Sequence, residues 1–320
     1  NHPDNTFPYR GYLQGSFYEH GLKNHITILD NAGKKGLDLA LQSAMEGQGI
    51  KISVTSPQSI LGYKTFAVND SNYIYIGRDH RVSADLRLLA NDGTGVQVST
   101  DDADESSLQN ITISMNRFEL GKLFTVLPFT PKMSGMLVGD YHIVKTKEDL
   151  TVSSDMTIKN LVYEGNPMGD VGTQLVYMPK DDGSHYVDAV ITKNGNEVGE
   201  LSGVYHSKDK GDLDATLTMD HFPLNYVNGF VPNQIVGLQG NGEGSLTVKG
   251  PLKNLDINGE VYLDSAYLVS VPYGLKMRFA NDPVLIKDSK IQFENFEMFS
   301  SNGSPLTLSG SLDFSNLDNM

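Results

Sequence analysis

Residues 213–219 read Leu-Asp-Ala-Thr-Leu-Thr-Met, with an apolar side chain at every second position. Because successive side chains of a β-strand point to opposite faces of the sheet, this alternation predicts a strand with one apolar face and one wet face. Many other segments repeat the pattern, among them Ile50, Ile52 and Val54, then Val82, Ala84, Leu86 and Leu88, and then Ile111, Ile113 and Met115. The sequence therefore predicts an all-β protein with nearly twenty strands, in which strands hold more than half of the residues.

Clusters of Asn, Asp and Gly separate the strand segments, as at 91–93, 181–183, 194–196 and 302–303. These residues are typical of tight turns. Short strands joined by such turns along the whole chain are typical of a solenoid or another repetitive sheet, and unusual for an ordinary globular domain.

Two segments, 117–127 and 221–231, instead place apolar residues three and four positions apart, which predicts two short helices. A proline follows each segment, and proline ends a helix. The apolar positions are Leu120, Leu123, Phe124 and Leu127 before Pro128, and Leu224, Val227 and Val231 before Pro232.

An internal repeat relates the two helical segments. With an offset of 104, Phe118 corresponds to Phe222; one added residue then moves the offset to 105, at which Gly139 corresponds to Gly244. We therefore expect three segments, which are an N-terminal β segment of the same sheet at 1–110, a first repeat unit at 111–212 and a second repeat unit at 213–320.

The composition limits the classes of partner. The chain has 25 basic and 39 acidic residues, a formal net charge of −14, and no run of basic residues, so we do not expect a nucleic-acid partner. It contains no cysteine, which excludes disulfides and thiolate metal sites. No apolar run reaches the roughly 18–20 residues of a membrane span. Because the chain begins at Asn1 without a signal peptide, we expect it to be part of a longer protein whose anchor lies outside it.

Residues that could carry out catalysis or hold a metal form no recognised motif. No GxSxG elbow is present, and no two histidines stand as HxH or HExxH. The glycines Gly240, Gly242 and Gly244 lack the strand-to-helix context of a phosphate loop and are typical of a curved strand. We expect no enzyme, no cofactor and no metal site, and solvated histidines at His2, His20, His25, His80, His142, His185, His206 and His221.

Carboxylates give no clearer signal. Residues 101–105 carry four carboxylates in five positions, a set that suits Ca²⁺, but no EF-hand glycine or distal glutamate follows, so we expect a solvated hairpin tip. A carboxylate pair for glycoside hydrolysis can be distant in sequence, but the absence of Trp argues against a sugar-stacking cleft.

The second repeat unit resembles a known family. Residues 240–261 read Gly-Asn-Gly-Glu-Gly-Ser-Leu-Thr-Val-Lys-Gly-Pro-Leu-Lys-Asn-Leu-Asp-Ile-Asn-Gly-Glu-Val, similar to the glycine-spaced strands, Gly-Pro-Leu and following strand of the TamB (translocation and assembly module) repeat. Residues 272–274, 284–293 and 308–314 continue the pattern. Residues 60–74 resemble the apolar strand, turn and solvent-facing Asn of Bacteroidetes-type members.

The resemblance implies a non-catalytic periplasmic segment of a protein that an N-terminal helix, absent from this chain, anchors in the inner membrane. TamB and its AsmA-like relatives are assigned to outer-membrane biogenesis, protein secretion and phospholipid transport along a β-taco groove. We therefore expect an elongated, curled trough with two short helices and a hydrophobic groove. Its cargo would be lipid acyl chains or nascent outer-membrane strands, and its partner an outer-membrane barrel assembly protein. The C-terminal segment that meets this partner in the family has no counterpart here.

The residues predicted to line the groove are those of the apolar phase. They are Ile52, Val54, Leu86, Leu88, Val96, Val98, Ile111, Ile113, Val152, Ile158, Leu217, Met219, Leu246, Val248, Ile257, Val261, Leu263, Leu275, Met277 and Leu308. Alternation alone favours a sealed core, whereas the resemblance favours an open groove. Two alternatives stay open: a closed solenoid or sandwich module that binds protein or glycan, and an enzyme on a β-helix scaffold whose carboxylates converge.

Overall fold

The structure, a computed structural model, describes residues 9–101, 107–126, 131–208, 211–230, 236–270, 272–281 and 283–313. Its 22 strands hold 73% of the residues and its two short helices 4%, and the strands form one antiparallel sheet. The all-β prediction with two short helices is confirmed. The chain divides into two compact units, Asn1–Val162 and Tyr163–Met320. The repeat boundaries at 110 and 212 stay a prediction.

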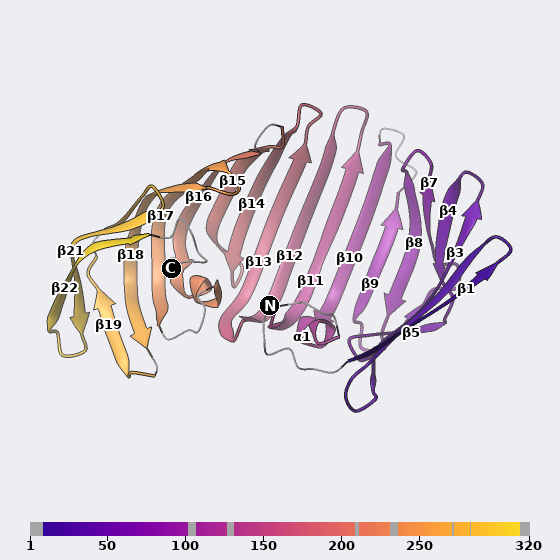
Figure 1. Cartoon of the computed structure of the whole chain (residues 1–320), viewed down its shortest axis with the longest axis horizontal. Coiled ribbons are helices and arrows are strands. Elements are labelled where there is room, and N and C mark those ends of the chain that lie inside the picture. Colours follow the sequence, from indigo (N-terminus) through magenta and orange to yellow (C-terminus); the bar gives the residue numbers. More distant parts are fainter. Residues whose placement is uncertain are drawn as a thin grey trace. The chain divides into compact units, whose positions relative to one another are not determined.

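Unit 1 contains the indigo to magenta strands of Figure 1 and the helix α1. Its elements are β1 (Arg10–Tyr18), β2 (Gly21–Leu29), β3 (Lys35–Glu46), β4 (Gly49–Val54), β5 (Gln58–Leu61), β6 (Lys64–Val68), β7 (Tyr73–Gly77), β8 (Val82–Leu89), β9 (Gly95–Thr100), β10 (Gln109–Glu119), α1 (Leu120–Phe124), β11 (Met133–Lys145) and β12 (Leu150–Tyr163), the last of which ends at the unit boundary.

Unit 2 contains the remaining strands and a 3₁₀ helix, η1. Its elements are β13 (Asn166–Pro179), β14 (Ser184–Lys193), β15 (Asn196–His206), β16 (Asp212–Pro223), η1 (Leu224–Phe230), β17 (Gly237–Pro251), β18 (Asp256–Ser270), β19 (Leu275–Phe279), β20 (Pro283–Lys287), β21 (Lys290–Ser300) and β22 (Pro305–Asp313). The glycines of residues 240–244 lie inside β17, as expected for a curved strand. The predicted helix ends at Leu127, Pro128, Val231 and Pro232, and the acidic residues 102–105, lie outside the described residues.

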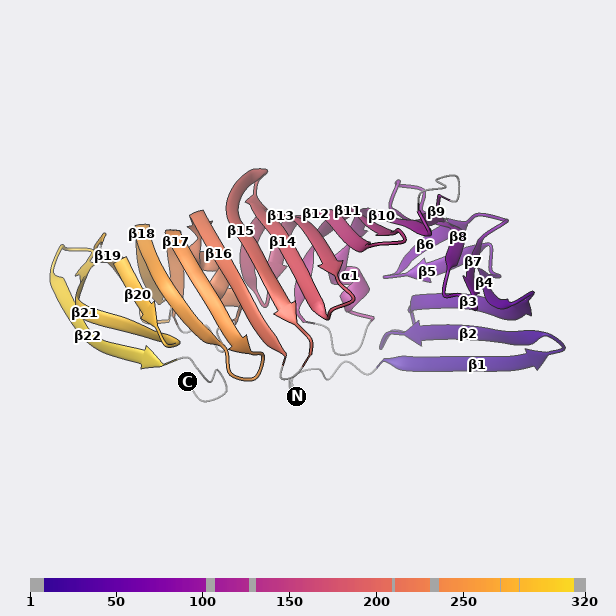
Figure 2. The same cartoon turned by 90° about the horizontal axis from the view of Figure 1, so that it is seen from above.

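Most strands pair with their neighbours in sequence, but each unit contains one split. In unit 1, β3 pairs with β4 over 41–46 and with β5 over 37–38, and two short layers, β4 with β7 and β5 with β6, lead on to β8. In unit 2, β18 pairs with both β19 and β20, and β21 pairs with both of them in turn. Figure 2 shows β1, β2 and β3 side by side before the first split.

A buried asparagine completes the hydrogen bonding at the split of unit 1. The Val54 amide donates to Asn72 Oδ1 at 2.6 Å, and Asn72 Nδ2 donates to the Val54 carbonyl at 3.0 Å. Because buried backbone groups need partners, this side chain takes the place of a neighbouring strand. Residues 60–74 were expected to carry a solvent-facing Asn; Asn72 is only 8% exposed, which corrects that expectation for this residue.

Bulges occur at equivalent positions of the sequence repeat. The pairing of β10 with β11 and that of β16 with β17 both shift register just before a phenylalanine, Phe118 and Phe222. The residues in the bulges, Arg117 and His221, have φ angles of 56° and 52°. β18 and β21 carry similar bulges, with Ser265 at φ 49° and Asn295 at φ 52°. Since a bulge bends its strand and increases its twist, the repeat places a bend at a fixed point of each strand.

Contacts of α1 show that the sheet of unit 1 curls. The helix follows β10, yet a Cβ on Gly62, in the turn between β5 and β6, would lie 3.1 Å from the Leu123 nitrogen. Val126 reaches the start of β3, where a Cβ on Gly36 would lie 2.1 Å from its Cγ1. In the order of pairing, β8 and β9 lie between β10 and the strands β3, β5 and β6. In a flat sheet, these two strands would keep α1 and Val126 away from Gly62 and Gly36.

η1 occupies the equivalent place in unit 2. Asn166, at the start of β13, donates from Nδ2 to the Asn225 carbonyl at 2.6 Å, and Asn225 Nδ2 donates to the Pro167 carbonyl at 3.0 Å. β14 and β15 lie between β13 and β16, the strand that leads into η1. The sheet of unit 2 therefore curls as well, and each short helix closes one end of its unit's sheet.

Replacing Gly244 by alanine is expected to lower the free energy of unfolding of unit 2 by about 2–3 kcal/mol. Gly244 has a φ angle of +141°, and a Cβ there would lie 2.1 Å from the Glu260 carbonyl oxygen of the neighbouring strand. Gly310→Ala is the matched control, because Gly310 has a φ angle of +147° with nothing within 4 Å, and about 1 kcal/mol is expected there. Hydrogen exchange of the flanking strand amides measures both losses. Equal losses would contradict a role for the close approach of β18.

Candidate functional site

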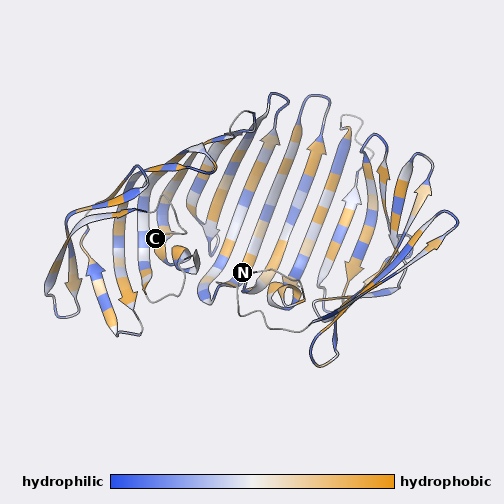
Figure 3. Ribbon diagram, viewed as in Figure 1, coloured by the Kyte–Doolittle hydropathy of each residue, from blue (hydrophilic) through white to orange (hydrophobic). Residues whose placement is uncertain are grey.

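In unit 2, apolar side chains of successive strands form rows across the sheet. Residues that pair directly in antiparallel strands lie on the same face, so each row marks one face. One row contains Leu175, Ala189, Leu201, Leu217 and Leu246, a single residue from each of β13 to β17. A second row beside it contains Tyr177, Val187, Gly203, Ala215, Val248 and Ile257. Together these rows form the apolar face of unit 2, and Figure 3 shows the alternation along the strands.

Unit 1 has an apolar face built in the same way. Its rows contain Ile52, Ile74 and Ala84; Leu86, Val98, Ile113 and Tyr141; and Leu88, Val96 and Met115. The odd and even positions of each strand therefore separate as the sequence predicts, with Lys51, Ser53 and Thr112 in the opposite phase.

The other predicted groove residues belong to the same two faces. Ile111 pairs with Ile143, Val54 with Leu41, and Leu308 with Phe296. Met219 and Val261 each lie opposite Gly244 on either side of β17, and Leu275 and Met277 alternate along β19. Leu263 packs against the buried cluster that contains Met277. Val152 and Ile158 share the phase of Met156, whose sulfur accepts a hydrogen bond from the Tyr141 hydroxyl.

The exposure of these twenty residues distinguishes a sealed core from an open face. Five are buried, namely Val54, Leu88, Met219, Val261 and Met277, two are exposed, namely Leu275 and Leu308, and the others are half-buried. A sealed core buries most of its large apolar side chains almost completely. Within the described residues, the apolar faces are only half covered.

In unit 1, buried side chains close the end of the apolar face that lies near α1. Phe66, Leu88 and Phe118 are buried in one cluster, and Leu123 of α1 packs against it. The rings of Phe66 and Phe118 stack with centroids 5.6 Å apart. α1 therefore covers the face at the end of the strands where the bulge of β10 lies.

The end of this face away from α1 is open. Met45, Ile50 and Ile76 pair directly across β3, β4 and β7, and their side chains are 61%, 43% and 39% exposed. Single exposed apolar side chains are common on protein surfaces. A row of them that continues a half-buried apolar face is instead a candidate binding surface. In unit 2 a buried cluster of Met277, Phe296 and Met298 closes the face near β19.

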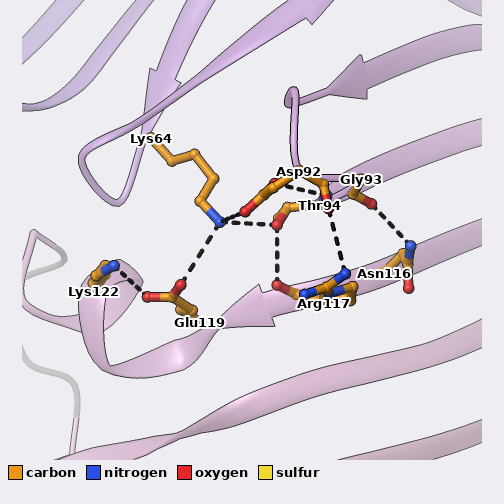
Figure 4. A network of polar contacts seen from close by, with 8 residues as sticks. All are labelled: Lys64, Asp92, Gly93, Thr94, Asn116, Arg117, Glu119 and Lys122. Atoms are coloured by element: carbon orange, nitrogen blue, oxygen red, sulfur yellow. Dashed lines mark hydrogen bonds and ion pairs between the residues drawn. The ribbon is translucent and has the colours of Figure 1, made fainter.

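A polar network ties the closed end of unit 1 together (Figure 4). Lys64 Nζ lies 2.8 Å from both Asp92 Oδ2 and Thr94 Oγ1, and 3.7 Å from a carboxylate oxygen of Glu119. The hydrogen bond from Lys64, with those from Thr94, lowers the pKa of Asp92 from its ordinary value. Because Lys64 begins β6, Asp92 lies in the turn before β9 and Glu119 ends β10, the network holds the ends of these three strands in their curled arrangement.

Two histidines depart from the expectation of solvated histidines without a second ligand nearby. One is the half-buried His25, whose Nε2 lies 2.7 Å from Asp38 Oδ1. The other is His221. Asp220, His221 and Glu243 offer ligand atoms within 4.8 Å of one another, and His221 makes contacts of 2.7 Å to Asp220 and 3.3 Å to Glu243. The hydrogen bond to Asp220 and the charge of Glu243 raise the pKa of His221, which favours the imidazolium. The sequence could not reveal this cluster, because Glu243 reaches it only through the register of β16 with β17. An exposed ion-pair cluster accounts for the contacts.

Comparisons with protein families, with curated proteins and with solved structures find no match for this chain. Neither short helix of the described residues has the length and apolar character needed to cross a membrane.

Proposed function

We propose that the apolar faces bind lipid acyl chains and shield them from water, and that the protein is a non-catalytic periplasmic segment of a longer, inner-membrane-anchored protein of the TamB type. The observation that carries the proposal is the row from Leu175 to Leu246, which five consecutive strands contribute and which stays half-buried. The resemblance of residues 240–261 to TamB repeats supports the cellular setting.

The energetics of acyl chains suit such a surface. Each CH₂ group taken from water contributes roughly 0.8 kcal/mol, so a 16-carbon chain contributes about 13 kcal/mol. A bilayer offers the same stabilisation, so a face lined by Leu, Ile and Val makes transfer from a membrane nearly isoenergetic. The acidic composition keeps a protein with this much exposed apolar surface soluble.

Nascent outer-membrane strands are the second cargo that the proposal includes, because their alternating apolar side chains would match the same rows. A barrel assembly protein of the outer membrane as partner rests on the resemblance alone. The alternative of an interaction module that binds protein or glycan predicts instead that substitutions on the polar phase abolish binding.

The test is a lipid analysis of protein purified without detergent, by native mass spectrometry and thin-layer chromatography. Bound phospholipid or fatty acid is expected, as is uptake of a fluorescent fatty acid after lipid removal. Protein that carries no lipid and takes up none would overturn the proposal.

A further inference from the structure

An open cavity lies at the ends of the strands of unit 2, beside η1. It has a volume of about 490 Å³, within the range of small-molecule sites. Its lining contains five side-chain amides, one lysine and no carboxylate, and consists of Asn166, Pro167, Lys193, Asn225, Asn228, Leu238, Gln239, Gly240 and Asn241. In a chain whose acidic residues outnumber its basic ones by 39 to 25, a lining rich in hydrogen-bond donors and free of carboxylates is suited to an anion.

Three of the amides give the cavity a fixed frame. Asn166 and Asn225 hold η1 against the start of β13 through the hydrogen bonds described above. Asn228 Nδ2 donates to the Leu238 carbonyl at 2.9 Å, and the Leu238 amide donates to Asn228 Oδ1 at 2.8 Å. The walls from β13, η1 and β17 are therefore joined without a ligand, so little conformational order has to be gained on binding.

The remaining polar groups of the lining are available for a ligand. Lys193, Gln239 and Asn241 make no side-chain hydrogen bond or ion pair within the described part of the chain. The lysines Lys64 and Lys249, by contrast, lie 2.8 Å and 3.0 Å from aspartate oxygens. Lys193 thus offers an ammonium group that no carboxylate of the described residues neutralises.

The position of Lys193 links the cavity to the apolar face. On β14 it continues the alternation of Ala189 and Ile191, and it pairs with Val171 on β13. Its side chain therefore leaves the sheet on the same side as the apolar rows, at their end. An apolar surface that ends in a cationic, amide-lined cavity matches an amphiphile with an anionic head group.

Two amides of the cavity lining have no amide counterpart in the first repeat unit. By the sequence repeat, Asn228 and Asn241 correspond to Phe124 and Met136 in unit 1. Apolar residues thus stand in the first repeat unit where the second has amides.

We propose that this cavity binds a phosphate group, with Lys193 as the charge partner. The inference rests on the proposed function where the phosphate belongs to a phospholipid whose acyl chains lie on the apolar face. A soluble phosphate compound offers the same chemistry, and the experiment separates the two sources.

The experiment measures binding to the full delipidated chain by calorimetry. Three probes are used: a short-chain phosphatidylglycerol, a diacylglycerol with the same acyl chains, and inorganic phosphate. The original protein is expected to bind the phospholipid about tenfold more tightly than the diacylglycerol, the effect of one charge-assisted hydrogen bond. Lys193→Gln is expected to remove this preference. Lys249→Gln, the same change on the polar phase of β17, should retain it.

The outcomes separate the two proposals. If Lys193→Gln keeps the full preference for phospholipid, the phosphate site is wrong while the acyl-binding function stands. If neither lipid binds but inorganic phosphate binds and loses affinity on Lys193→Gln, the site takes soluble phosphate and the lipid function is wrong. If no probe binds, both are wrong.

Discussion

Leu217→Glu is expected to reduce the amount of lipid bound per protein by about tenfold or more. Leu217 lies in the middle of the row of unit 2, between Leu201 and Leu246. A carboxylate at this position would have to lose water when an acyl chain covers it, and burying a charge without a partner is costly. The row would also lose apolar contact area, which contributes roughly 25 cal/mol per Å². Quantitative lipid extraction from protein purified without detergent measures the change.

Thr218→Glu is the matched control for this substitution. Thr218 is exposed and follows Leu217 on the same strand, so its side chain leaves the opposite face of the sheet. Lipid content should then match that of the original protein. A loss of lipid in both variants, with circular dichroism unchanged, would show that binding does not depend on the apolar face.

Phe66→Ala is expected to destabilise unit 1 by about 3–5 kcal/mol. Phe66 is 1% exposed, stacks on Phe118 and lies in the cluster that α1 covers. The substitution leaves a cavity where the short strands β5 and β6 meet the rest of the sheet, and the loss of stacking adds to the cost. We expect the amides of β6 and β8 to exchange faster with solvent, which hydrogen exchange measures for this unit separately.

Phe17→Ala makes the same chemical change at an 89% exposed position of β1 and should alter stability by less than about 0.5 kcal/mol. Hydrogen exchange of the β1 and β2 amides gives this value. A loss at Phe66 no larger than that at Phe17 would contradict the description of α1 and its cluster as the closed end of the face.

The sequence was sufficient to predict the all-β fold and the apolar phase of the alternating strands, because a strand has a strict period of two. Leu213, Ala215, Leu217 and Met219 all lie on one face for this reason. Backbone pairing then brings the rows together without help from any special residue. Apolar spacing located both short helices for a similar reason, because a helix has a period of its own, whereas the bulges were not predicted.

Features that depend on pairing between distant residues could not be predicted. At the split between β4 and β5, Asn72 supplies hydrogen bonds that a neighbouring strand would otherwise make. In the sequence, Asn72 looks like an ordinary turn residue. The cavity amides Asn166, Asn225 and Asn228 also read as turn residues, and only the curl of unit 2 brings them together. The contact between His221 and Glu243 depends on the exact register of two strands.

Photo-crosslinking along β17 shows whether lipid lies on the apolar rows of unit 2. A photoreactive amino acid is placed in turn at positions 246, 247, 248 and 249 of the full chain, and lipid adducts are counted by mass spectrometry after expression in cells. Positions 246 and 248 lie in the apolar rows, and 247 and 249 face the other way. Lipid adducts are expected at 246 and 248 and none at 247 and 249. Equal labelling at all four positions, or no lipid adduct at any of them, would contradict lipid binding on these rows.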